Sequence, residues 1–201
     1  EYTMSAFGKD VKAVLAQEEI DRAILIGHSM GGDVIAEAAS LMPDRVIGII
    51  GIDTLQDVSG RYPQSEIDGM VAPLEADFRH GTRHFVATMF PEGTDGRLIQ
   101  WIQEDMASAP SDIAINAFRN YLNQYVDGEA AEVFKTLRIP VVSLNGRLWP
   151  TNLENNRKVM AHYDLFYIEE TGHFPMLERP EAFNQRLQEV IGHIETLHAS
   201  E

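Results

Sequence analysis

A serine with glycines two positions away on either side stands at the centre of the pentapeptide 27–31. The pentapeptide follows an apolar run at 23–26 and precedes a run of mostly small residues at 32–39. This pattern is typical of a strand, a sharp turn and a helix, and such a turn lifts the hydroxyl out of the sheet while leaving no room for side chains at the flanking positions. Ser29 is therefore a candidate nucleophile.

A serine hydroxyl becomes an effective nucleophile only with a base in hydrogen-bond reach, and that base needs an acid to orient it. His173 is the strongest candidate base, because it follows the last predicted strand within the segment 171–180, Thr-Gly-His-Phe-Pro-Met-Leu-Glu-Arg-Pro. Parallel strands end at one edge of a sheet, so we expect His173 beside Ser29.

The other histidines have weaker claims to a catalytic role. His28 lies inside the elbow, where we expect it to shape the turn. His80 and His84 are four residues apart on a predicted helix, a spacing compatible with a metal ion, but the sequence offers no third ligand and favours solvated or packed histidines. The remaining three fall on predicted helix surfaces or near the end of the chain: His162, His193 and His198. We expect no metal and no cofactor.

The elbow and the segment 171–180 together resemble the α/β-hydrolase superfamily, whose catalytic histidine lies in a loop of very similar sequence. The resemblance covers nearly the whole chain and is strongest at these two motifs. It implies an esterase- or lipase-like serine hydrolase with a helical cap, with Ser29 as the nucleophile and His173 as the general base. It also implies the chain order serine, acid, histidine.

The position of the acid departs from the commoner family pattern. In most relatives the strand corresponding to 139–145 is followed by a glycine and, three residues later, by the acid. Here Gly146 is followed by Trp149 at that position, and an indole cannot orient an imidazole.

A minority arrangement, found in some haloalkane dehalogenases, takes the acid from the end of the preceding strand. Asp53 stands at that point, twenty-four residues after Ser29, and we predict it as the acid. The alternative interpretation is that Asp53 only caps the loop that follows. Asp57 and Glu154 remain as alternative acids.

The oxyanion of acyl transfer needs two preorganised N–H donors. One is expected to be the backbone amide of Met30, at the start of the helix after the elbow. The family's second donor comes from a loop after its third strand, and about four strands precede the helix that this chain predicts at 5–18. The resemblance thus implies the C-terminal part of the fold with its N-terminal strands absent. We expect an unpaired apolar edge at 22–27 and a possible homo-oligomer.

Apolar periodicity predicts an α/β fold with a parallel sheet, since near-continuous apolar runs alternate with amphipathic helices. The strands are expected at 22–27, 45–52, 139–145 and 165–168. A helix at 5–18 precedes them, another runs from the elbow to about Leu41, and a last one carries an apolar stripe from Phe183 to Leu197.

The long segment between the second and third strands predicts a helical cap over residues 55–138, with the core formed by 1–54 and 139–201. Its aromatic and methionine residues recur at roughly helical spacing, and most are ordinary packing residues. We expect a few to line a pocket over the elbow. The candidate substrate-binding residues are His28, Met70, Phe78, Phe85, Trp101, Trp149 and Phe174.

The amino-acid composition limits the classes of molecule that the protein is expected to bind. The 201 residues are 44% hydrophobic, contain no cysteine and carry a formal net charge of −15, which opposes binding to nucleic acid or to an anionic membrane. We expect a small ester-like substrate and a cytoplasmic location. The function predicted is hydrolysis of a carboxylic ester of a small, largely apolar molecule through an acyl-enzyme. Alternatives are a ligand sensor of the same fold, a lactonase, a C–C bond hydrolase and a cofactor-free perhydrolase.

Overall fold

The computed structural model describes residues 1–199, which contain one parallel sheet in the spatial order β1-β2-β3-β4. The strands are β1 (Ala23–His28), β2 (Val46–Ile52), β3 (Val141–Asn145) and β4 (Tyr163–Tyr167). Every neighbouring pair is parallel. The predicted α/β fold class with a parallel sheet is confirmed.

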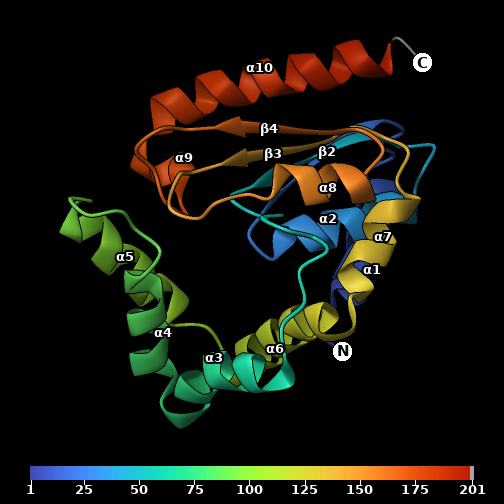
Figure 1. Cartoon of the computed structure of the whole chain (residues 1–201). Helices are drawn as coiled ribbons and strands as arrows, with labels where there is room; N and C mark the ends of the chain where they lie inside the picture. Colours follow the sequence, from blue (N-terminus) through green and yellow to red (C-terminus); the bar gives the residue numbers. More distant parts are fainter. Residues whose placement is uncertain (200–201) are drawn as a thin grey trace.

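Helices cover both faces of the sheet, which explains why β2 is buried along its whole length. Ile49 packs with residues of α1 (Met4–Gln17) and α2 (Gly31–Ser40) on one face, and Ile50 packs with residues of α10 (Pro180–His198) on the other. Figure 1 shows α10 lying along one face of the sheet and α2 on the opposite side. This alternation follows from the two-residue period of a strand.

The C-terminal strand and its neighbours differ from the prediction in detail. β4 begins at Tyr163 rather than at residue 165, because Tyr163 and Asp164 pair with the first two residues of β3. Asp164 is polar, so the apolar pattern of the sequence did not reveal the first two residues of β4. Helix α8 (Leu153–Val159) and the single turn α9 (Pro175–Glu178) were not predicted.

Residues 53–140 contain five helices and no strand. They are α3 (Gln64–Ala76), α4 (Phe78–Ala87), α5 (Gly96–Met106), α6 (Ser111–Asp127) and α7 (Glu129–Thr136). In Figure 1, α3 to α6 lie apart from the sheet, whereas α7 lies near α2 and α8. Phe134 of α7 belongs to the apolar cluster beneath the sheet. The division into core and cap at residues 55 and 138 stays a prediction.

The carboxyl ends of the strands position the candidate chemistry. Ser29 directly follows β1 and Asp53 directly follows β2, and the register pairs the last residues of the two strands, His28 with Ile52. The two residues therefore emerge side by side at one edge of the sheet.

The β1 strand forms one border of the sheet within residues 1–199, since it pairs only with β2 there. Ile26 on this strand is 45% exposed, so the border is apolar as predicted, and oligomer formation through it stays a prediction. Within the same residues, no helix combines the length and the apolar character needed to cross a membrane.

Candidate active site

The elbow holds Ser29 in a left-handed backbone conformation, with a φ of 55°. A non-glycine residue rarely adopts this conformation, and such strain is concentrated at functional sites. The Ser29 amide donates to the carbonyl of Ile52 at 3.1 Å, which ties the turn to β2.

The crowding around the elbow differs in part from the prediction. A Cβ at Gly27 would lie 2.1 Å from the carbonyl oxygen of Gly31, so no side chain fits there. At Gly31 itself a Cβ would meet nothing within 4 Å, so the expectation for this flanking position is wrong. The second crowded position is Gly32, where a Cβ would lie 2.5 Å from the methyl carbon of Thr54.

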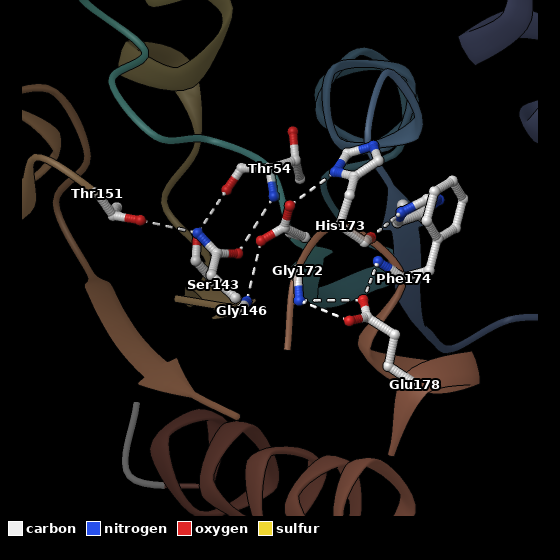
Figure 2. Close-up of polar contacts among 11 residues, drawn as sticks. Thr54, Ser143, Gly146, Thr151, Gly172, His173, Phe174 and Glu178 are labelled. Carbon is white, nitrogen blue, oxygen red and sulfur yellow. Dashed lines mark hydrogen bonds and ion pairs between the residues drawn. The ribbon is translucent and has the colours of Figure 1, made fainter. Parts of the chain in front are cut away.

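His173 and Asp53 contact each other directly. Nδ1 of His173 lies 2.6 Å from Oδ2 of Asp53, whose other carboxylate oxygen accepts a hydrogen bond from the Gly146 amide at 2.9 Å (Figure 2). Asp53 is 1% exposed and His173 is 6% exposed. Because an ionised carboxylate only accepts hydrogen bonds, Nδ1–H must donate, which leaves Nε2 with the lone pair that a base uses.

The two alternative acids lie elsewhere. Asp57 accepts hydrogen bonds from Ser59, Asn152 and Asn155, and together these outweigh its partial burial and lower its carboxyl pKa. Glu154 is exposed on α8 and pairs with Lys158 at 2.7 Å. Neither residue is among those that line the cavity at the elbow.

The loop after β3 still supports the site, although it lacks the commoner acid. Its first residue, Gly146, donates the backbone hydrogen bond to Asp53 described above. The Trp149 ring packs edge-on against the imidazole of His173, with 5.2 Å between ring centroids. The tryptophan thus limits the movement of the histidine and forms part of the cavity wall.

His28 also contacts the histidine loop. Its Nε2 lies 2.7 Å from the carbonyl oxygen of His173, and since a carbonyl only accepts, Nε2–H donates. Burial, with a smaller contribution from the neighbouring His173, lowers the pKa of His28 to about 4. The ring is therefore neutral near pH 7, in keeping with the shaping role predicted for it.

Glu178 is a supporting residue whose importance the sequence reasoning missed. Its carboxylate accepts the backbone amides of Gly172 and Phe174, on either side of His173, at 2.9–3.0 Å (Figure 2). Burial raises the pKa of Glu178. The sequence signal that could have identified Glu178 is its position five residues after the histidine, on the single turn of helix that follows the loop.

A cavity of about 620 Å³ opens at the elbow, and Ser29, Met30, Asp53 and His173 all line it. Six of the seven predicted substrate-binding residues line it as well: His28, Met70, Phe78, Phe85, Trp149 and Phe174. Trp101 does not, because it lies on α5 with its side chain outside the cavity and 57% exposed. Lining residues that were not predicted as such include Leu74, Thr82, Met89, Met106, Phe118 and Tyr121.

A buried carboxyl group joins the elbow helix α2 to α6. Asp33, one turn after Ser29 on α2, is 2% exposed and accepts a hydrogen bond from the Tyr125 hydroxyl of α6 at 3.3 Å. Burial raises the pKa of Asp33 to about 7, and the Tyr125 hydrogen bond opposes that rise only in part.

His80 and His84, the pair with metal-compatible spacing, are exposed on α4. Among residues 1–199, no group of three or more histidine, aspartate or glutamate side chains is arranged to hold a metal ion.

The fold and the site together have three features: a parallel α/β sheet, a strained serine turn at the carboxyl edge of that sheet, and a histidine–carboxylate pair beside the turn. The model of the alpha/beta hydrolase family matches residues 1–186. The chain belongs to this family.

Its relatives carry esterase names. A Haemophilus influenzae protein named "Putative esterase/lipase" is 26% identical over 182 residues, which are 86% of this chain and 61% of that protein. Esterase YbfF of Escherichia coli is 26% identical over 124 residues, 62% of this chain and 41% of that protein. The chain thus spans about two fifths to three fifths of these relatives.

Solved structures share the fold. An esterase from Exiguobacterium antarcticum superposes with a TM-score of 0.80 at 18% identity, covering 96% of this chain and 74% of that one. A thermophilic esterase from Thermogutta terrifontis gives a TM-score of 0.78 at 21% identity, covering 96% and 73%.

Proposed function

We propose that this protein is a serine hydrolase that cleaves a carboxylic ester of a small, largely apolar substrate through an acyl-enzyme. The observation that carries the proposal is the 2.6 Å contact between His173 and Asp53 in the cavity that Ser29 lines from its strained turn. The esterase names of the relatives agree with it.

In the proposed mechanism, Nε2 of His173 takes the proton of Ser29 as its Oγ attacks the ester carbonyl. Asp53 orients the imidazole and stabilises the imidazolium that forms. The developing oxyanion receives a hydrogen bond from the Met30 amide at the N-terminus of α2, where the helix dipole also favours negative charge. His173 then protonates the leaving alcohol, and the same base activates a water molecule that releases the acid.

The cavity wall supports an apolar substrate. Apart from the reacting groups, the lining consists largely of phenylalanine, methionine, leucine and alanine side chains, most of them from α3, α4 and α6, with Met106 from α5 and Met89 and Phe174 from loops. Such a wall contributes binding energy in proportion to the apolar area that it covers, and it does not reward charge.

A fluorophosphonate probe tests the nucleophile. We expect one equivalent of label on Ser29 of this chain and none on the Ser29→Ala variant, with peptide mass spectrometry locating the label. Repeated turnover of p-nitrophenyl esters then supports an enzyme, whereas one slow acylation without release supports the alternative ligand sensor. Absence of label on the wild-type chain, or equal labelling of Ser29→Ala, contradicts the proposal.

A further inference from the structure

Three consecutive residues of the histidine loop, 172–174, face a segment at the end of α4. This segment, residues 88–91, directly follows the helix. A Cβ at Gly172 would lie 2.4 Å from the Met89 carbonyl oxygen and 2.9 Å from Cδ of Pro91. Only a glycine allows this approach, so the two segments are in close contact.

A hydrogen bond and a ring contact continue the pairing. The His173 amide donates to the Met89 carbonyl at 2.9 Å. The next residue of each segment also meets its counterpart, because the rings of Phe90 and Phe174 stack with 5.3 Å between their centroids and 21° between their planes. Both phenylalanines are buried, so the contact is shielded from water.

The Met89 carbonyl completes the set of hydrogen bonds that hold the backbone around the histidine. Glu178 accepts the amides before and after His173, and Nε2–H of His28 donates to the His173 carbonyl. The amide of His173 itself is held from the end of α4. Because the imidazole is attached to this backbone, a turn of the loop would displace Nδ1 from Asp53.

Phe90 can act on this loop without touching a substrate. Met89 and Phe174 line the cavity, whereas Phe90 does not. Phe90 packs instead in the apolar cluster that also contains Phe174 and Ile102 of α5. An effect of Phe90 on turnover would therefore pass through the loop and not through a lost contact with the substrate.

We propose that Phe90 is a positioning residue for His173: its ring holds segment 88–91 against the histidine loop, so that the Met89 carbonyl keeps the imidazole on Asp53. The effect on turnover rests on the proposed function, since it requires His173 to act as the base. A displacement of about 1 Å caused by a distant substitution can reduce a rate about 100-fold. Loss of the ring contact thus lowers turnover while the atoms that line the cavity stay in place.

Steady-state hydrolysis of a p-nitrophenyl ester gives the first test, at a temperature where urea titration shows every variant to be folded. Phe90→Leu stays apolar but lacks the stacked ring, so its kcat should fall about 10-fold while KM stays within about 2-fold of the wild-type value. Phe90→Ala should lose more.

Ile67→Ala is the matched control. Ile67 is fully buried on α3, lies outside the cavity and packs in a separate apolar cluster with Val71 and Leu122. Truncating it should destabilise the fold as a Phe90 truncation does, because both leave a buried void. Its kcat should nevertheless stay within about 2-fold of the wild-type value, since the contacts of the histidine loop remain.

A spectroscopic readout separates this inference from the proposed function. In the proton NMR spectrum, an imidazole Nδ1 proton that hydrogen bonds to a carboxylate resonates downfield of the amide protons, and its loss in His173→Gln assigns it. We expect this resonance in the wild type and in Ile67→Ala, and a shifted or broadened resonance in Phe90→Leu and Phe90→Ala. That result supports the positioning of His173 even if no ester is hydrolysed.

Several results would overturn the inference. They are absence of the resonance from the wild type, an unchanged resonance in both Phe90 variants, and an equal change in Ile67→Ala. Wild-type kcat in both Phe90 variants would overturn it as well, and the proposed function would then still stand, because the esters are hydrolysed.

Discussion

The cavity has two walls that are held together differently. The strand-end wall consists of Ser29, Asp53 and His173 with their supporting groups. Hydrogen bonds from backbone amides hold this wall in place, because the amides of Ser29, Gly146 and His173 each donate to an acceptor in another part of the chain. The cap wall consists of the cavity-lining residues of α3, α4 and α6, and apolar contacts dominate it.

This difference agrees with the tasks that the proposed function assigns to the two walls. Directed hydrogen bonds hold reacting atoms to within a fraction of an ångström, as acid–base chemistry requires. Apolar packing specifies volume and shape but not the direction of an individual atom. We therefore expect changes in the strand-end wall to act on turnover or folding, and changes in the cap wall to act on substrate affinity.

The largest effect is expected from Asp53→Asn. The variant keeps the size of the side chain but cannot hold Nδ1–H in the required orientation or stabilise the imidazolium, so kcat should fall about 10⁴-fold. Steady-state hydrolysis of a p-nitrophenyl ester measures it. Glu154→Gln is the control, because this exposed carboxylate pairs only with Lys158 among the contacts described for it. Near-normal turnover in Asp53→Asn would remove Asp53 from the proposed site.

A second comparison contrasts two glycines of the elbow. In Gly27→Ala, the added Cβ would lie 2.1 Å from backbone oxygen, so the free energy of unfolding should fall by about 3 kcal/mol or more. In Gly31→Ala, the Cβ meets nothing within 4 Å, and the change should stay within about 1 kcal/mol. Urea denaturation of both variants measures this. An equal loss of unfolding free energy in the two variants would show that the close approach of Gly27 to the Gly31 carbonyl does not limit the turn.

Asp33 provides a pH-dependent test at the junction of the two walls. Its folded-state pKa of about 7 lies above the unfolded value of 3.8, so the folded state holds the proton more tightly. This contribution to stability is present below pH 4 and is lost as the pH rises through 7. Glu37 on α2, and Tyr121 and Tyr125 on α6, face the same carboxyl.

Asp33→Asn should therefore be more stable than the wild type by about 4 kcal/mol at pH 8, with little difference at pH 4. Unfolding in urea at a series of pH values gives this difference. Subtracting the two curves also removes the opposite contribution of His28, whose lowered pKa makes the fold lose stability as the pH falls from 6.5 to 4. A difference that does not vary with pH would contradict burial of an ionisable group here.

The smallest effect is expected in the cap wall. Met70 on α3 lines the cavity and is 38% exposed, so Met70→Ala removes apolar contact that the bound substrate and the transition state share. KM should rise about 5-fold, equivalent to about 1 kcal/mol, with kcat unchanged. Trp101→Ala is the control, because Trp101 lies outside the cavity. A loss of kcat in Met70→Ala would show that the cap takes part in the chemistry.

Much of the fold could be predicted because its signals are local. The apolar runs that form β1, β2 and β3 and the periodic helices between β2 and β3 follow directly from residue spacing. The errors lie where a neighbouring element decides: β4 begins early because Tyr163 pairs with Val141, and the polar start of that strand carried no apolar signal.

The sequence alone determined the strand, turn and helix around Ser29, the loop that carries His173 and the apolar character of the cap, because each depends on residues close together in the chain. Only the tertiary structure decided which carboxylate meets the histidine, since Asp53 and His173 are 120 positions apart. It also decided that Trp101 lies outside the cavity and that the Met89 carbonyl holds the His173 amide. The physical reason is that these outcomes depend on how helices pack across the molecule, which periodicity within one helix does not specify.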